Sequence, residues 1–361
     1  MEQSACSLAL HRAALASLAL LLAAPEFAAQ RTRPGAASPF TPTVIVPERY
    51  RLRIIELPPG FTYPYVSRLN ESGHVVGSCL SLYDFGASSA FVWTPESGTV
   101  LLGGSESAGL GTTARDINRR DVIVGAVLAI HQPGLTWLSP PEPFYDPSNY
   151  LPLPPPSPLR GNLALNDGGT VLGGADWVWD PVRGTRTFAE LGFFNAFSAH
   201  DINESNQVAG SVDRMHACRF DLATGKHVVL GSLGGEWSDA LGINDHGHVV
   251  GWSLDAEGRY RPFRWTPATG MQALGDASWE GIASSVNGAG QVVGWATHHG
   301  RNTAFLWDAG HGMRALGPLV DDLGTLELVG AADINEAGWI VGSGTDAATG
   351  ETRGCVLRPK R

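Results

Sequence analysis

The chain has 361 residues, 43% hydrophobic and 17% charged, so it can form one large domain or two ordinary domains with a substantial core. Its formal net charge of −10 argues against a nucleic-acid partner, because binding phosphates needs clustered Lys and Arg. The 45 glycines and 24 prolines indicate many tight turns and short strands, without the three-residue period of collagen.

The first segments of the chain have the pattern of an exported protein. Arg12 precedes an apolar run, residues 13–24, that is too short to span a bilayer, and a pair of alanines follows it. We therefore predict a signal peptide at 1–29 and a secreted protein, extracellular or periplasmic. No membrane span is expected. Residues 30–49 are rich in Pro, Ala and Ser, which predicts a flexible leader, and residues 50–361 are predicted to form the folded domain.

One pattern recurs seven times in the folded domain: an Asn, a turn-forming residue three positions later, and a Gly four positions after that. The seven structural turn asparagines are spaced 37 to 48 residues apart: Asn70, Asn118, Asn166, Asn203, Asn244, Asn287 and Asn335. An Asn that opens a turn can bond backbone two residues further on. The turn-forming positions hold only Gly, Asn or Asp, which tolerate positive φ: Gly73, Asp121, Gly169, Asn206, Gly247, Gly290 and Gly338. Each copy therefore predicts a β-hairpin.

Two further strands are predicted after each hairpin. The second hairpin strand always ends in Gly, as at Gly77 and Gly251, which implies a β-bulge or a close neighbour there. A third strand ends in an aromatic residue in six copies: Trp93, Trp137, Trp179, Phe220, Trp265 and Trp307. We expect these rings to be core and to cover the strand glycines. A Gly-led turn then introduces a fourth strand.

The seventh copy lacks a fourth strand, because the chain stops soon after its third strand. The segment Tyr50–Leu57 resembles the fourth strands and precedes the first hairpin. We expect it to pair with the carboxyl-terminal repeat and remove the open edges. Seven units of four strands predict an all-β fold, a closed seven-bladed β-propeller. An open β-solenoid is the alternative architecture.

Two regions are candidate binding surfaces. The insert 139–158 contains nine prolines and the aromatic residues Phe144, Tyr145 and Tyr150. Such a segment favours polyproline II geometry and can dock a glycan or peptide, although it can equally be a spacer between blades. A second candidate is a loop face carrying three residues on variable connections: His131, Trp237 and Trp279.

The repeats resemble those of the bacterial "extracellular repeat, HAF family" proteins. Leu233-Gly234-Gly235, Ile243-Asn244, Val249-Val250-Gly251 and the run 303–307 match that repeat well, and the resemblance covers residues 50 to 358. The namesake His-Ala-Phe triplet is nowhere intact. The resemblance implies export and a propeller-like fold, and it carries no catalytic residues to transfer.

Sequence motifs for chemistry are weak. The mature chain keeps three cysteines, Cys79, Cys218 and Cys355, and an odd number predicts buried thiols with at most one bridge. No nucleophile elbow, zinc-binding pair, P-loop or dinucleotide fingerprint is present, so no catalytic residue, metal site or cofactor is predicted. Three aspartates stand two positions before a repeat Asn: Asp116, Asp201 and Asp333. They predict either bonds that brace the hairpins or a ring of carboxylates around a cation.

Three functions remain open from the sequence. The preferred one is a non-enzymatic binding or scaffold propeller that uses its loops to hold a glycan or a protein. A propeller hydrolase or lyase with its site at the channel mouth is the first alternative. Carboxylates or histidines clustered at one mouth with shifted pKa values favour this alternative. The second alternative is a structural protein of an envelope or matrix. The oligomeric state is not predicted.

Overall fold

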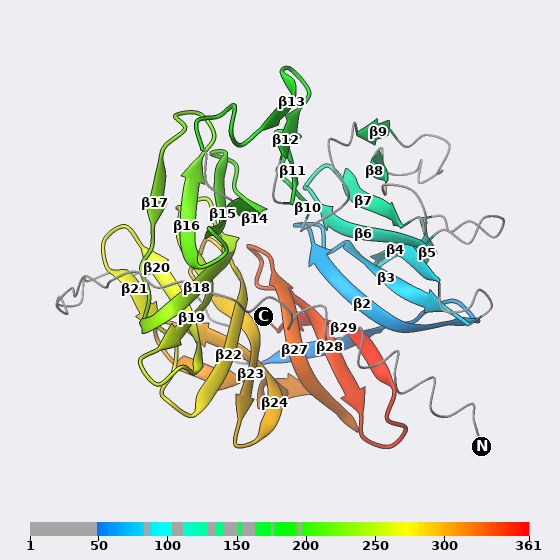
Figure 1. The fold of residues 1–361 in the computed structure, drawn as a ribbon. Coiled ribbons are helices and arrows are strands. Elements are labelled where there is room, and N and C mark those ends of the chain that lie inside the picture. The colour runs from blue at the N-terminus through cyan, green and yellow to red at the C-terminus, as the bar shows by residue number, and fades with distance from the viewer. Residues whose placement is uncertain are drawn as a thin grey trace, which may run out of the picture. The chain divides into compact units, whose positions relative to one another are not determined.

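The structure, a computed structural model, describes residues 49–82, 87–102, 111–128, 135–139, 151–153, 163–174, 177–193 and 197–360. The expected signal peptide, and the expected leader up to residue 48, lie outside these ranges. The described residues form an all-β propeller whose blades have four strands (Figure 1).

Six sheets have four antiparallel strands in chain order. The first three sheets comprise β2 (Phe61–Leu69), β3 (Val75–Ser81), β4 (Ser88–Thr94) and β5 (Gly98–Leu101); β6 (Gly111–Ile117), β7 (Ile123–Leu128), β8 (Leu135–Ser139) and β9 (Leu151–Leu153); and β10 (Leu163–Leu165), β11 (Val171–Gly173), β12 (Trp177–Asp180) and β13 (Gly184–Thr187). The next three comprise β14 (Phe197–Ile202), β15 (Gln207–Val212), β16 (His216–Asp221) and β17 (His227–Val229); β18 (Gly234–Ile243), β19 (Val249–Asp255), β20 (Tyr260–Thr266) and β21 (Gly270–Ala273); and β22 (Trp279–Val286), β23 (Val292–His298), β24 (Arg301–Asp308) and β25 (Gly312–Ala315).

The remaining sheet joins both ends of the folded region. It has five strands in the order β26 (Val320–Asp321), β1 (Tyr50–Ile55), β29 (Thr352–Pro359), β28 (Ile340–Asp346) and β27 (Leu326–Ile334), with a short 3-10 helix at Gly317–Leu319 before β26. Strand β1 pairs antiparallel with β29, from Tyr50 opposite Pro359 to Ile55 opposite Gly354. The expected pairing of this segment with the carboxyl-terminal repeat is therefore present. The fifth strand, β26, was not expected, and it pairs parallel with β1.

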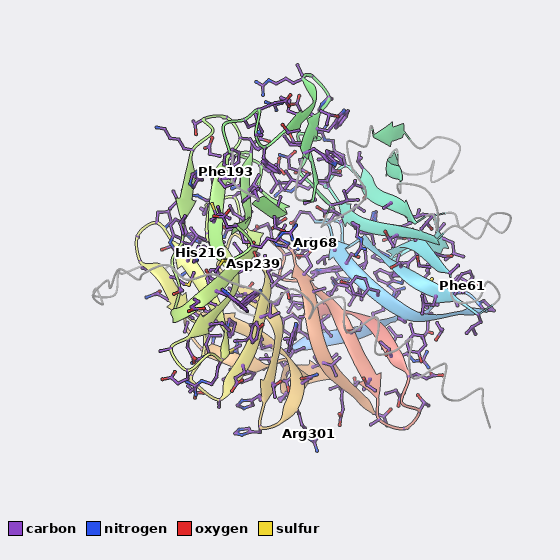
Figure 2. The ribbon with its side chains drawn as sticks, in the orientation of Figure 1. Phe61, Arg68, Phe193, His216, Asp239 and Arg301 are labelled. Atoms are coloured by element: carbon purple, nitrogen blue, oxygen red, sulfur yellow. The ribbon has the colours of Figure 1, made fainter. Side chains whose placement is uncertain are left out.

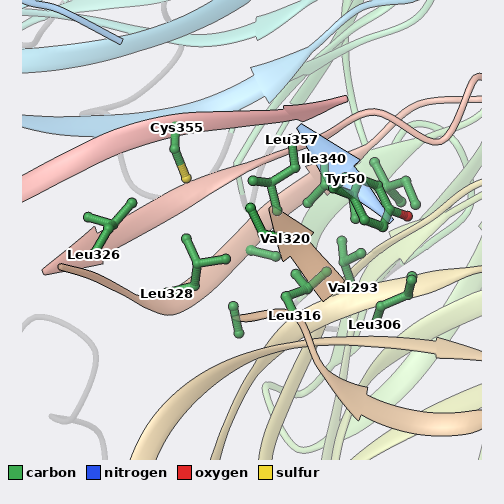
Figure 3. Packing of buried hydrophobic residues seen from close by; sticks show 13 residues of the cluster. Tyr50, Val293, Leu306, Leu316, Val320, Leu326, Leu328, Ile340, Cys355 and Leu357 are labelled. Carbon is green, nitrogen blue, oxygen red and sulfur yellow. The ribbon is translucent and has the colours of Figure 1, made fainter. Parts of the chain in front are cut away.

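A buried apolar cluster holds the two ends together (Figure 3). Tyr50 is fully buried and packs with Leu357 of β29, Ile340 of β28 and Val320 of β26. Leu306 of β24 and Leu316, directly after β25, belong to the same cluster, so the sixth sheet also packs against the joined ends. Burial of these side chains, at roughly 25 cal/mol per Å² of apolar surface, stabilises the contact between the ends of the fold.

The seven hairpins have the geometry that the repeat predicts. Each turn-forming residue has a φ between 58° and 82°, which explains why only Gly, Asn and Asp occupy that position. In the first hairpin the Asn70 Oδ1 accepts the backbone N–H of Ser72 and of His74, both at 3.0 Å. The prediction of Asn-opened turns is confirmed.

The same asparagines also connect the sheets to one another. Each Asn donates from its Nδ2 to the backbone carbonyl oxygen of the Asn in the next repeat, at 2.8 to 3.2 Å. The last of these bonds runs from Asn335 back to Asn70, at 3.0 Å, so the seven bonds form a closed cycle. The first strands follow the same cycle, since each contacts the first strand of the next sheet and β27 contacts β2.

Six of the seven strand glycines face β-bulges in the first strands, and the seventh, Gly173, lies against the Trp177 ring in an unshifted register, so the sequence's two alternatives both occur. In the fifth sheet the pairing of β18 with β19 shifts between Ala240 and Gly242, directly beside Gly251. A Cβ on Gly251 would lie 2.0 Å from the Asp239 carbonyl oxygen, and one on Gly210 would lie 2.0 Å from the Ser198 carbonyl oxygen. The bulge pushes a carbonyl into the space of a side chain, so only Gly fits.

One expectation about the aromatic rings was wrong. Trp93 and Trp265 are buried, as predicted, but the ring over Gly77 belongs to Phe91 and the ring over Gly294 to Phe305. In the antiparallel register Gly77 lies opposite Phe91, whereas Trp93 lies opposite Val75. The covering ring is therefore two residues before the aromatic residue that ends the strand.

The Pro-rich insert contributes a strand. Residues 140–150 and 154–158 lie outside the described ranges, but Leu151–Leu153 is β9, the fourth strand of the second sheet. Pro152 is tolerated there because the outermost strand leaves one side of its backbone unpaired.

Candidate functional site

The second residue before each repeat Asn defines a layer of side chains that we call the axial position. The bulge in the first strand redirects the chain just before this residue, as between Ala199 and Asp201. Its occupants differ from copy to copy: Arg68, Asp116, Ala164, Asp201, Gly242, Ser285 and Asp333.

The three aspartates at the axial position connect neighbouring sheets. Each accepts, on its Oδ2, the backbone N–H of the residue before Asn in the next sheet: Asp116 from Leu165 at 2.8 Å, Asp201 from Ile243 at 2.9 Å and Asp333 from Leu69 at 3.0 Å. These N–H groups lie on the open edge of a first strand and need an acceptor. The sequence predicted local bonds that brace each hairpin; these bonds brace instead one sheet against the next.

Arg68 is the basic residue at the axial position (Figure 2). Its guanidinium lies 3.4 Å from the Asp201 carboxylate and 3.5 Å from the Asp333 carboxylate, and its side chain is 18% exposed. Asp201 lies in the fourth sheet, which does not adjoin the first sheet in the cycle of contacts. This contact therefore crosses the middle of the ring. Two of the three axial carboxylates therefore have the Arg68 guanidinium as their counter-charge.

The charges at the axial position shift one another's ionisation. Burial raises the pKa of Asp116 to about 7, with Arg68 opposing the shift and the charges of Asp201 and Asp333 adding to it. Burial also raises the pKa of Asp201, again against the pull of Arg68. Burial lowers the pKa of Arg68, but the surrounding carboxylates outweigh it and the net shift is upward. Arg68 therefore stays charged, while Asp116 is poised between its two forms at neutral pH.

A histidine–carboxylate pair lies beside this cluster. His200 Nε2 is 3.2 Å from the Asp239 Oδ2, and the two side chains are 15% and 19% exposed. Burial lowers the pKa of His200, but the charge and hydrogen bond of Asp239 outweigh it, so the pKa is raised. The Asp239 Oδ1 is buried, and among the described residues it has no hydrogen-bond partner. Such a pair can hold or transfer a proton.

Among the residues the structure describes, no group of three or more His, Cys, Asp or Glu is placed to hold a metal ion. Cys79, Cys218 and Cys355 are buried free thiols. Burial raises the pKa of each thiol to about 12, so none of them is a reactive thiolate.

Aromatic side chains of two sheets that do not adjoin, the first and the fifth, lie near the strand ends opposite the Asn hairpins, and we call this set of side chains the aromatic end. It comprises Tyr63, Tyr65, Trp237, Trp252 and Tyr260. The side chain of Tyr65 is 62% exposed and that of Tyr260 is 46% exposed, with the Tyr260 ring 4.9 Å from that of Trp252. Tyr63 has a φ of 51°, which is unusual for a bulky residue.

The residues predicted to bind a ligand fall into three groups. His131, Phe144, Tyr145 and Tyr150 lie outside the described ranges. Trp237 in β18 is partly buried, and its Nε1 is buried without a hydrogen-bond partner. Trp279 is only 7% exposed because its ring stacks on His298 at 3.8 Å. The structure therefore keeps Trp237 as a candidate binding residue and makes Trp279 a core residue.

Sequence reasoning missed Arg68, His200 and Asp239. A signal for Arg68 was present, because it occupies the repeat position at which three other copies have Asp. His200 is the bulged residue of β14, and Asp239 lies in the first strand of the next sheet. Their proximity depends on the packing of two sheets, for which the local sequence has no signal.

In the part of the chain that the structure describes, no helix is long and apolar enough to cross a membrane. No family model matches the chain. The search of curated proteins also found no match.

Solved propeller structures resemble the fold at low sequence identity. A streptogramin B lyase matches with a TM-score of 0.55 and 11% identity, over 86% of this chain and 98% of its own. A virginiamycin B lyase from Staphylococcus aureus matches with a TM-score of 0.54 and 12% identity, over 86% of this chain and 99% of its own. A puromycin-hydrolyzing peptidase from Mycobacterium tuberculosis matches with a TM-score of 0.52 and 14% identity, over 85% of this chain and 53% of its own. At these identities the likeness establishes the propeller fold alone.

Proposed function

We propose that the chain is a secreted, seven-bladed propeller that binds a glycan at its aromatic end and performs no catalysis. Counting the five-stranded sheet as the seventh blade, with β1 as its fourth strand, is supported by the closed cycle of asparagine bonds. The signal-like segment supports export, and the repeat supports membership of the HAF family.

The observation that carries the binding proposal is the exposure of large rings at one end of the sheets. Tyr65 and Tyr260 expose 62% and 46% of their side chains, although aromatic residues normally bury most of their surface. A tyrosine offers a flat apolar face for the C–H groups of a sugar ring and a hydroxyl for its polar groups. Tyrosines also form rigid contact surfaces at a small cost in conformational entropy.

The experiment is a glycan array with the mature protein, followed by calorimetry on the best glycan. We expect the double variant Tyr65→Ala/Tyr260→Ala to lose at least tenfold in affinity while its thermal unfolding stays unchanged. Val182→Ala is the control, because Val182 is 90% exposed in the turn between β12 and β13, at the hairpin end of its sheet. An unchanged affinity in the double variant contradicts the aromatic end as the binding site.

A second candidate function, a hydrolase or lyase, is favoured by the His200–Asp239 pair and the charged cluster beside it. A carboxyl with a pKa of about 7, such as Asp116, is suited to proton transfer at neutral pH. The structural neighbours include lyases and a peptidase. The test is a screen of the native protein against hydrolase and lyase substrates. Turnover that is lost in His200→Gln and in Asp239→Asn, in a protein that binds no glycan, would establish this second function.

A further inference from the structure

The axial cluster contains more negative than positive charge in a largely buried place. Three carboxylates, Asp116, Asp201 and Asp333, surround one guanidinium, and Arg68 forms ion pairs with only two of them. Asp116 is 7% exposed, and no ion pair to it is found among the described residues. Like charges that share a buried site cannot all stay ionised without a large free-energy cost.

Asp116 makes two bonds that hold its carboxyl group in place. Its Oδ1 accepts the backbone N–H of Ile117 at 2.8 Å, and its Oδ2 accepts that of Leu165 in the next sheet, also at 2.8 Å. The group therefore cannot turn towards solvent when it ionises without breaking a contact between the second and third sheets.

The groups around the two aspartates come from several strands. β2 contributes Arg68 and Tyr65, β27 contributes Asp333, and β18 contributes Asp239. On their own strands, Asp116 has Arg115 as a neighbour and Asp201 has His200. Of the other strands packed against them, β4, β7, β10, β11 and β15 contain no titratable residue, and β3 contains Cys79, whose pKa is raised by burial.

We propose that the axial cluster binds a proton at neutral pH, on the carboxyl group of Asp116, and that loss of this proton weakens the contacts between sheets. Deprotonation places a further negative charge next to Asp201 and Asp333 with no counter-ion. The ring is then held less firmly between the second and third sheets and between the fourth and fifth. The binding of this proton therefore makes the stability of the contacts between sheets depend on pH.

The direction of the effect follows from linkage. A carboxyl group whose pKa is raised in the native state stabilises the fold fully below its ordinary pKa and loses that contribution as pH rises through its native value. For Asp116 that value is about 7. We therefore expect the unfolding equilibrium constant to rise by up to tenfold per pH unit as the pH approaches 7 from below, and the rise to level off above it.

The experiment measures urea unfolding of the full chain at pH values from 5 to 9, for the native sequence and for Asp116→Asn. The variant keeps a polar side chain of the same shape but cannot titrate, so its pH dependence should be reduced by the Asp116 contribution. The control is Asp276→Asn, since Asp276 is an exposed carboxyl whose bond with Ser278 lowers its pKa. An equal pH dependence in Asp116→Asn and the native protein overturns the proposal.

A second measurement needs no variant and decides the matter if Asp116→Asn does not fold. Carbon-13 NMR of the aspartate carboxyl groups in the native protein should show an axial carboxyl that titrates close to pH 7. Amide exchange at Leu165 and Ile243, corrected for the intrinsic effect of pH, should become faster across the same range. Ordinary acidic titration of all aspartates, with constant protection at both amides, refutes the proposal.

Discussion

Two layers of side chains, at positions only two residues apart in every repeat, differ in how uniform they are: one has the same residue in every copy, and the other does not. The turn layer has Asn in all seven copies, and each Asn makes the same bond to the next. The axial position has Arg, Asp, Ser, Ala or Gly: its aspartates bond the next sheet, and the ion pair of Arg68 with Asp201 crosses the ring. The comparison teaches that equivalent residues join neighbouring sheets, whereas unlike residues make contacts specific to this chain.

The largest expected effect tests the axial position. Arg68→Met should lower the free energy of unfolding by about 3–5 kcal/mol, because it leaves partly buried carboxylates without a counter-charge. Chemical denaturation measures this loss. Arg68→Lys keeps the charge and should lose less, and a loss below about 1 kcal/mol in Arg68→Met would show that the cluster is held by the backbone bonds alone.

A smaller effect is expected at the bulges that precede the axial position. Gly251→Ala should lower the free energy of unfolding by about 3 kcal/mol, since its Cβ would lie 2.0 Å from the Asp239 carbonyl oxygen and the strands must shift. The matched control is Gly317→Ala, where the nearest atom would lie at 3.7 Å. Thermal unfolding of both variants makes the test, and equal stabilities would mean that the bulge adjusts freely.

The smallest expected effect tests the turn layer at the closure of the cycle. Asn335→Ser keeps a side-chain oxygen that can accept a turn N–H, as Asn335 accepts that of Trp339 at 2.9 Å, but removes the amide that donates to the Asn70 carbonyl oxygen. One lost hydrogen bond should lower the free energy of unfolding by about 1 kcal/mol. The urea midpoint should fall with an unchanged m-value. If Asn335→Ala is no less stable than Asn335→Ser, the turn bond contributes nothing.

The sequence by itself determined the hairpins, the residues with positive φ and the need for Gly opposite the bulges. These features depend on the local backbone, and the repetition of the pattern made each copy evidence for the others. The sequence also identified Tyr50–Leu57 as a strand for the last sheet, because a unit without its fourth strand leaves an open edge.

Only the tertiary structure decided which unlike residues meet and which rings are exposed. Arg68 contacts Asp201 across the ring and Asp333 on the adjoining last sheet, and no local pattern encodes either distance. Trp279 is covered by His298, whereas Tyr65 is left open to solvent. Exposure and charge pairing are properties of packed sheets, so they arise only after the repeats have assembled.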